Sequence, residues 1–186
     1  MGKGNPVFDW SQWFSLKGAG QNKAIPGEAG IYRIRRSENT SLDYVGQTGP
    51  TLGLRRRLGM LKGMYGQVMP YNDPHTAGPA LWALRQLENC EYEASVVPVS
   101  ASSTPLRKGF ECLVIARHRQ EFGKSPTFNF GRMPRGYSKS TSNTRQLVAR
   151  GKRRRGDLTD EFLASHQPGL APLGSIEGAV IGDDLL

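Results

Sequence analysis

The 186-residue sequence predicts a small α+β domain in which helices flank a three-stranded, mainly antiparallel sheet. Residues 29–36 and 42–47 alternate in the manner of strands, and the polar residues between them suit a hairpin turn. Later segments carry helix-capping residues and apolar periodicity, with one further strand among them. The length suits one domain with a core plus arms rather than two full domains.

An N-terminal arm, residues 1–28, precedes the predicted hairpin. It has enough aromatic surface to dock on the domain as a short helix, which Asp9 or Ser11 would open. The aromatic residues are Phe8, Trp10, Trp13 and Phe14. The arm lacks the long apolar run of a signal peptide or a membrane span. We therefore expect a cytoplasmic protein with no membrane partner.

Two helices and a strand are expected after the hairpin. Residues 52–64 form the first helix, which carries three successive arginines. After a loop rich in Gly, Pro, Asn and Asp, Pro79 occupies a position where helices begin, and residues 80–88 form the second helix. Residues 92–99 form the third strand, and Pro98 indicates an edge strand or the end of a strand.

The third helix is predicted over residues 104–121, with Thr104 as its N-cap and Gly123 at its C-terminal end. Its apolar stripe consists of Leu106, Phe110, Leu113 and Val114. Glu111 lies about 100° from Phe110 around the helix axis, at the edge of this stripe. A carboxylate there is exposed, paired or bound to a cation.

The composition changes after residue 130. Residues 131–156 contain nine Lys or Arg and no Asp or Glu, which predicts a basic DNA-binding extension. Residues 157–186 are acidic and rich in Gly and Pro, and we expect a loosely ordered tail there. The net charge of +9 favours a polyanionic partner, nucleic acid first. Cys90 and Cys112 lack metal-ligand spacing, so they are expected to be buried free thiols rather than a zinc site.

Five motifs follow one another between residues 29 and 130. They are Gly30-Ile31-Tyr32, Tyr44-Val45-Gly46, Leu54-Arg55-Arg56-Arg57-Leu58, Glu111 and Pro126-Thr127-Phe128-Asn129. In this order they resemble the GIY-YIG nucleases, and the small size with embellished loops is similar to the restriction-endonuclease-like members. The resemblance implies a GIY-YIG catalytic domain over residues 29–130, whereas the arm and the tail match nothing in the family.

The resemblance also implies a reaction, the hydrolysis of DNA phosphodiester bonds with one Mg²⁺ (or Mn²⁺) per active site. Tyr32 would polarise or position the attacking water, and Tyr44 would hold the phosphate or the water. Arg57 would bind the non-bridging oxygens, because its planar cation suits them. Glu111 would be the metal ligand, and Asn129 would tie the site together by hydrogen bonds.

Two departures from the family pattern leave alternatives open. The loop before the arginines is longer than in compact members, so Arg55 competes with Arg57 for the catalytic role. Many members carry a histidine where this chain has Leu61, and His75 is the candidate substitute or an exposed loop residue that caps the next helix. The expected DNA contacts are Arg55, Arg56, Lys62, Arg132, Arg135, Lys139, Arg145, Lys152, Arg153, Arg154 and Arg155.

The sequence supports more than one biological role for this chemistry. A restriction or defence enzyme that cuts double-stranded DNA, as a homodimer, is the main hypothesis. A structure-specific repair nuclease or a nuclease toxin would use the same residues. A non-cleaving nucleic-acid-binding module, in which the hairpin tyrosines stack on bases, is the alternative from another class.

Overall fold

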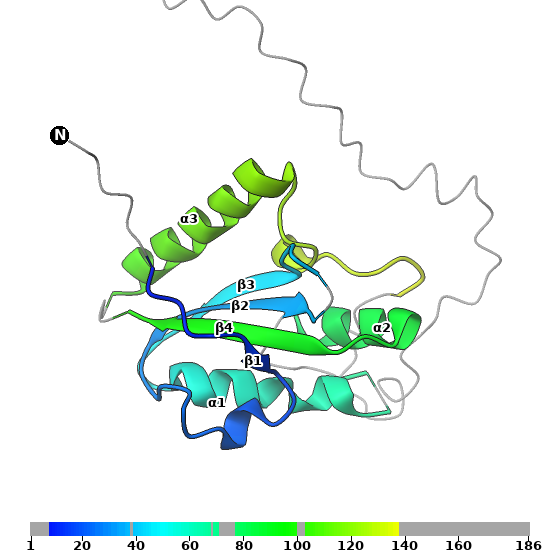
Figure 1. The fold of residues 1–186 in the computed structure, drawn as a ribbon, viewed down its shortest axis with the longest axis horizontal. Helices are drawn as coiled ribbons and strands as arrows, with labels where there is room; N and C mark the ends of the chain where they lie inside the picture. The colour runs from blue at the N-terminus through cyan, green and yellow to red at the C-terminus, as the bar shows by residue number, and fades with distance from the viewer. Residues whose placement is uncertain (1–7, 38, 68, 71–76, 100–102, 138–186) are drawn as a thin grey trace, which may run out of the picture. The chain divides into compact units, whose positions relative to one another are not determined.

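The computed structural model describes residues 8–37, 39–67, 69–70, 77–99 and 103–137. They form a four-stranded antiparallel sheet with helices on both faces (Figure 1). The strands are β1 (Phe14–Ser15), β2 (Gly30–Arg36), β3 (Tyr44–Thr48) and β4 (Tyr92–Pro98). Their order across the sheet is β1-β4-β2-β3.

The prediction of a three-stranded sheet is wrong, because the N-terminal arm supplies a fourth strand. Phe14 pairs with Ala94, and the expected helix near Asp9 or Ser11 is absent from the described part of the arm. A two-residue strand is too short to show alternation, and its conformation follows from pairing with β4. With β1 on its outer side, β4 lies inside the sheet, so Pro98 marks the end of a strand.

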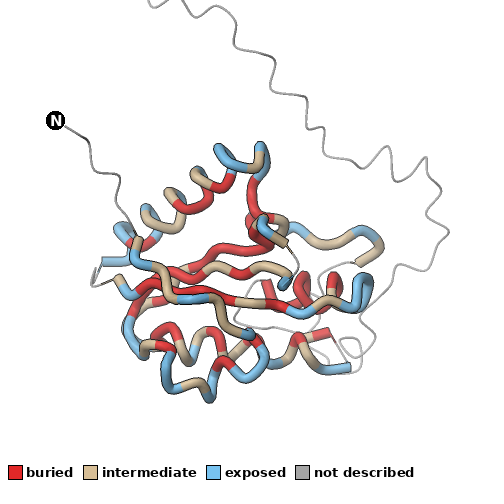
Figure 2. Tube along the Cα trace, viewed as in Figure 1, coloured by how far each residue is buried: buried red, intermediate tan, exposed pale blue. Residues whose placement is uncertain are grey.

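One face of the sheet is covered by α1 (Gly53–Gly59), the 3₁₀ helix η2 (Met60–Tyr65) and α2 (Gly78–Glu88). The predicted helix over residues 52–64 is thus divided into an α-helix and a 3₁₀ segment. The largest core cluster lies here, where Tyr32, Ile34 and Val96 of the sheet meet Leu58 and Leu81 of the helices. The buried residues form continuous segments along the strands (Figure 2).

The opposite face is covered by α3 (Thr104–Phe122), which lies across the sheet from α1 (Figure 1). Ile31 and Val45 of the sheet pack there against Val114 and Ile115 of α3. Phe8, Trp10 and Trp13 of the arm adjoin the same cluster.

The inner face of α3 agrees with the predicted stripe in part, since Val114 is buried in the core and Phe110 packs against it. Leu106 is half exposed, whereas Arg107, Val114, Ile115 and His118 are buried. Leu106 follows the apolar spacing, but in the first turn of α3 the buried side chain is that of Arg107, which donates to Gln47 of β3. The N-cap is Ser103, whose hydroxyl accepts from the Leu106 N–H, one residue before the predicted Thr104. The prediction for Gly123 is confirmed, since it ends the helix with φ 68°.

Two further elements close the fold. The short 3₁₀ helix η1 (Ala19–Gln21) lies against α1, where the backbones of Gly20 and Gly59 approach so closely that a side chain on either would collide. After α3 the chain runs along the outer edge of β3, and the Phe128 N–H donates to the Asp43 carbonyl at 2.8 Å. It ends in η3 (Asn129–Gly131).

Two smaller expectations have separate outcomes. Both cysteines are free thiols, but the prediction that both are buried is wrong, because Cys112 lies on the outer side of α3 and Cys90 is half-buried. None of the helices in the described part of the chain has the length and apolar character needed to cross a membrane.

Candidate active site

The two motif tyrosines form a pair on the face of the sheet that α1 covers. Tyr32 lies opposite Gly46 and Ile34 lies opposite Tyr44, which makes the tyrosines diagonal neighbours on adjacent strands. Their ring centroids are 6.2 Å apart with an interplanar angle of 32°. A Cβ on Gly46 would lie 2.3 Å from the Tyr32 hydroxyl oxygen. Glycine at this position therefore makes room for the Tyr32 phenol.

The environment of Tyr32 keeps its phenol protonated. The side chain has 0% exposure, compared with 8% for Tyr44. Burial, followed by the neighbouring Tyr44, raises the pKa of Tyr32 far above its ordinary value, and the charge and hydrogen bond of Arg57 only partly oppose this. At neutral pH Tyr32 consequently keeps its proton, and its phenolate forms less readily than that of a phenol in water.

The arginines at positions 55 and 57 point to different surroundings. Side chains two positions apart on a helix differ in direction by about 200° around its axis. Arg57 is hydrogen bonded to Tyr32 and influences the carboxyl of Glu111. Arg55 instead donates from Nε to the Ile25 carbonyl at 2.8 Å and from Nη2 to the Lys23 carbonyl at 3.1 Å. The geometry thus favours Arg57 as the arginine of the site and gives Arg55 a role in holding the N-terminal arm.

Glu111 reaches the site from α3. Its half-buried carboxylate has no hydrogen bond or ion pair with the residues that the structure describes, although Lys108 and Arg57 are nearby cations. Burial raises the pKa of Glu111, and these two cations lower it in part. Partial burial destabilises the ionised form of a carboxylate that lacks such a partner. A bound cation would stabilise that ionised form.

Mg²⁺ fits this carboxylate as a single protein ligand. Within the described ranges no group of three His, Cys, Asp or Glu side chains could hold a metal. Mg²⁺ retains several waters and takes one or two carboxylates together with substrate phosphates, so a single glutamate suits it. Glu111 is therefore the residue that would hold the ion.

Asn129 lies beside the tyrosine strand. Its amide is 4% exposed and exchanges two hydrogen bonds with the backbone of Val45, which lies between Tyr44 and Gly46. Asn129 therefore positions β3 and does not itself face the phenols.

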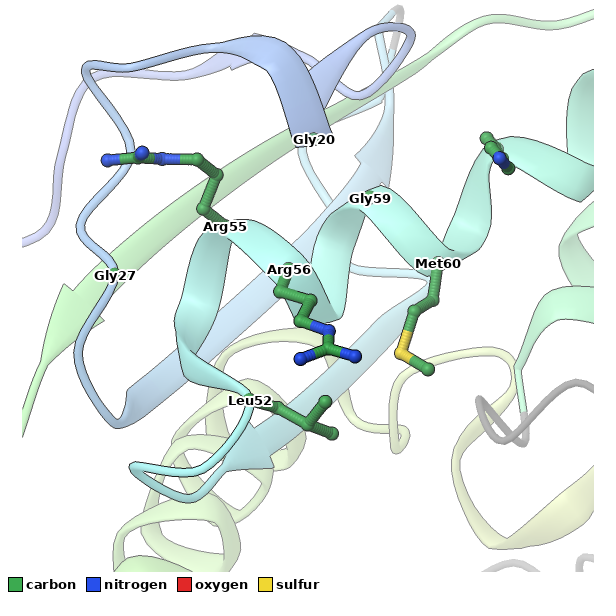
Figure 3. Close-up of a pocket in the computed structure, with 8 residues that line it drawn as sticks. Gly20, Gly27, Leu52, Arg55, Arg56, Gly59 and Met60 are labelled. Carbon is green, nitrogen blue, oxygen red and sulfur yellow. The ribbon is translucent and has the colours of Figure 1, made fainter.

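Part of the predicted DNA-binding surface borders a cavity of about 440 Å³ between α1 and the N-terminal arm (Figure 3). Arg55, Arg56 and Lys62 line it, and Arg56 and Lys62 are exposed. In the close-up, Arg55 points toward the arm whereas Arg56 points away from it. Two exposed cations thus lie on and just beyond the helix that carries Arg57.

The other predicted residues divide into two groups. Arg132 and Arg135 are exposed in the segment after η3. The rest lie outside the described residues, and they are His75, Lys139, Arg145, Lys152, Arg153, Arg154 and Arg155.

Arg107 is a residue that the sequence reasoning missed. It is 4% exposed, donates from Nε to Gln47 Oε1 at 3.2 Å, and donates from Nη2 to Thr104 Oγ1 at 2.9 Å. Its guanidinium also lies close to Gly49, after the end of β3. The available signal was its position four residues before Glu111, on the same side of α3.

No protein-family model, curated protein or solved structure matches this chain. The resemblance to the GIY-YIG nucleases consequently depends on the five motifs and on the geometry of their residues.

Proposed function

We propose that this chain is a GIY-YIG-type DNA endonuclease that depends on Mg²⁺ or Mn²⁺. One observation carries the proposal, namely that Tyr32, Tyr44, Arg57 and Glu111 come from separate parts of the sequence and form one electrostatically linked group. A packing role alone would not require an arginine and a half-buried glutamate beside two phenols.

The chemistry assigns a different contribution to each residue. Arg57 binds the non-bridging oxygens of the scissile phosphate, where its fixed charge opposes the charge that develops during attack. Tyr44, the more accessible phenol, contacts the phosphate or the attacking water. When bound at Glu111, the metal ion supplies charge neutralisation for the phosphate and the leaving oxygen.

Tyr32 acts in this proposal mainly as a positioning residue. Its buried, protonated phenol is hydrogen bonded to Arg57 and borders Tyr44, so it fixes the two groups that contact substrate. A role as general base would require a large fall in its pKa, for which added positive charge near Arg57 is the physical route.

The substrate proposed is double-stranded DNA, and the protein is proposed to act as a cytoplasmic homodimer in restriction or defence. A net charge of +9 supports a polyanionic substrate. Arg56 and Lys62 offer exposed cations near the Arg57 helix. A chain with one site cuts one strand, and a second copy would cut the other.

The deciding experiment incubates plasmid DNA, modified and unmodified, with the purified protein and Mg²⁺ or Mn²⁺. Cleavage that EDTA abolishes and that Glu111→Gln loses is expected. Glu28→Gln is the matched control, because this exposed glutamate lies outside the site and should leave cleavage unchanged. Tight DNA binding by the wild-type protein without any cleavage would favour the non-cleaving module.

A further inference from the structure

A second cavity, of about 300 Å³, lies on the face of the sheet opposite the tyrosine pair. One side is formed by Trp10 and Trp13 of the arm, and the other by Arg117, His118 and Phe122 of α3. In Figure 1 the arm begins near the N-terminal end of α3 and then runs along β4. None of the GIY-YIG motifs explains why aromatic and cationic side chains gather there.

The arm side of this cavity is an alternating stack of indoles and guanidiniums. The Arg33 guanidinium carbon lies 4.3 Å from the ring centroid of Trp10 and 4.6 Å from that of Trp13. Arg35 lies 4.0 Å from the Trp13 ring, on the same face of β2. Both indoles are partly exposed, so they retain surface that another planar group can contact.

The opposite wall, on α3, contains a stacked pair of uncharged aromatic rings. His118 is stacked on Phe122 with ring centroids 4.6 Å apart at 29°. Its Nε2 accepts from the Leu42 N–H at 2.9 Å, so Nδ1 carries the proton and donates to the Lys124 carbonyl at 2.8 Å. Burial lowers the pKa of His118, which keeps this tautomer neutral. The imidazole is thereby fixed as a wall of the cavity.

The cavity has more positive than negative charge. Arg33, Arg35 and Arg117 line it together with a single carboxylate, Glu121. Arg35 is paired with Glu93 at 3.0 Å, whereas the buried Arg33 Nε has no hydrogen-bond partner among the described residues. Burial and the like charge of Arg35 lower the pKa of Arg33 to about 10, although Glu121 opposes this. An anion beside Arg33 would relieve both effects.

We propose that this cavity binds one nucleotide unit of single-stranded nucleic acid, with the base between the two aromatic walls and the phosphate beside Arg33 and Arg117. The proposal rests on the nucleic-acid part of the proposed function, and not on cleavage. The cavity is at the lower end of the roughly 300–1,000 Å³ typical of small-ligand sites, which suits a single nucleotide and excludes a duplex. Aromatic walls beside cations are the arrangement that binds single strands without regard to sequence.

The test measures tryptophan fluorescence while a short oligothymidylate is added in EDTA, so that cleavage does not interfere. Quenching is expected, because two of the three tryptophans line the cavity. Arg117→Ala, which removes a phosphate contact, and Phe122→Leu, which keeps bulk without an aromatic face, should each weaken binding by about tenfold. Arg119→Ala is the matched control, since it removes an exposed arginine of α3 that does not line the cavity.

The outcomes separate this proposal from the proposed function. Unchanged affinity in both variants would overturn the nucleotide site, even if the protein cuts plasmid DNA. Oligonucleotide binding that the variants weaken would support it, even if no cleavage is found. Hexaglutamate that competes as well as the oligonucleotide would also overturn it and indicate an acidic peptide as the occupant. Circular dichroism melting checks the fold of Phe122→Leu, and Arg117→Ala tests the site independently of that substitution.

Discussion

The side-chain amide of Asn129 is hydrogen bonded at both ends to the backbone of Val45. The Val45 N–H donates to Oδ1 at 2.9 Å, and Nδ2 donates to the Val45 carbonyl at 2.8 Å. These are the groups that strand β3 presents at the outer edge of the sheet. Asn129 therefore completes the edge as a further strand would, and it fixes the backbone between Tyr44 and Gly46.

Asn129→Ala should lower the free energy of unfolding by about 1–3 kcal/mol, because it leaves a buried N–H and a buried carbonyl without partners. Urea denaturation measures the loss. Asn129→Asp should be at least as severe, since a carboxylate oxygen would face the Val45 carbonyl. Asn22→Ala removes a solvent-exposed hydrogen bond to the Ala24 N–H and serves as the control. Equal losses at positions 22 and 129 would contradict this structural role.

Gly46→Ala should disrupt the tyrosine pair. The added Cβ would lie 2.3 Å from the Tyr32 hydroxyl and 2.8 Å from a Tyr44 ring carbon, so at least one phenol must move. We expect about 1–3 kcal/mol of destabilisation from overpacking and a loss of cleavage. Gly109→Ala on α3 is the control, because no atom lies within 4 Å of its added Cβ. That variant should gain about 0.5–1 kcal/mol from helix propensity. A Gly46→Ala protein that melts and cleaves like the wild type would refute the close packing described.

Arg57→Ala should lower the cleavage rate by about 10²–10³-fold, the cost of losing one preorganised donor to a developing charge. Arg55→Ala should instead weaken the attachment of the arm, because Arg55 donates to the carbonyls of Lys23 and Ile25. Its expected signature is a lower melting temperature with cleavage retained at saturating enzyme. Single-turnover kinetics and thermal melting on both variants check this, and a larger cleavage defect in Arg55→Ala would reverse the assignment.

Sequence reasoning was sufficient for elements whose own residues determine their structure. The β2–β3 hairpin, α2 and α3 follow from periodicity, turn residues and caps within each segment. Strand β1 could not be found in this way, because two residues carry no period and their pairing partners lie 78 and 80 positions away in the sequence. The start of α3 was misassigned by one residue, since Ser103 and Thr104 are equally good caps on residue type alone.

The candidate site shows the same division between local and non-local information. The motifs proposed Tyr32, Tyr44 and Glu111 as site residues, but the choice between Arg55 and Arg57 required the rotation of α1 relative to the sheet. The burial of Arg107 could not be predicted from the sequence either, because it depends on the position of Gln47 near the end of another strand. Composition likewise could not show that Tyr32 is wholly buried.

Glu111→Gln should lower the cleavage rate by at least about 100-fold. In the absence of metal, the same substitution should stabilise the protein. Burial raises the pKa of the Glu111 carboxyl, so the native state binds this proton more tightly than the unfolded chain. The resulting stability is fully present below the ordinary glutamate pKa and is lost as the pH rises through the folded value. At pH 7 the glutamine variant should therefore melt above the wild type, and the difference should shrink in acid.

The same titration has the opposite effect on activity. Cleavage should rise with pH through the raised Glu111 pKa, because the ionised carboxylate holds the metal. Added Mg²⁺ should raise the melting temperature of the wild type alone. Differential scanning fluorimetry from pH 4 to pH 8, with and without Mg²⁺, measures both effects. A Glu111→Gln protein that Mg²⁺ stabilises as much as the wild type would place the ion elsewhere.

The first residues of the predicted basic extension pack against the folded domain. Met133 and Tyr137 pack against the core, and the Tyr137 ring meets Trp82 edge to face at a centroid distance of 6.0 Å. A truncation after Gly131 would therefore remove packing as well as charge. A stop after Tyr137 retains these contacts and still removes seven of the nine cations between residues 131 and 156.

The protein truncated after Tyr137 should bind duplex DNA more weakly and with a flatter dependence on salt. Removing one cation that neutralises a phosphate reduces the slope of log K against log salt concentration by roughly 0.9. Cleavage should persist at low salt with saturating enzyme, since Tyr32, Tyr44, Arg57 and Glu111 all remain. A protein truncated after Gly156 is the control, because it keeps every cation of the extension and removes only the acidic tail. Fluorescence anisotropy with labelled duplex at several salt concentrations gives the slopes, and identical slopes for the two truncated proteins would refute DNA binding by residues 138–156.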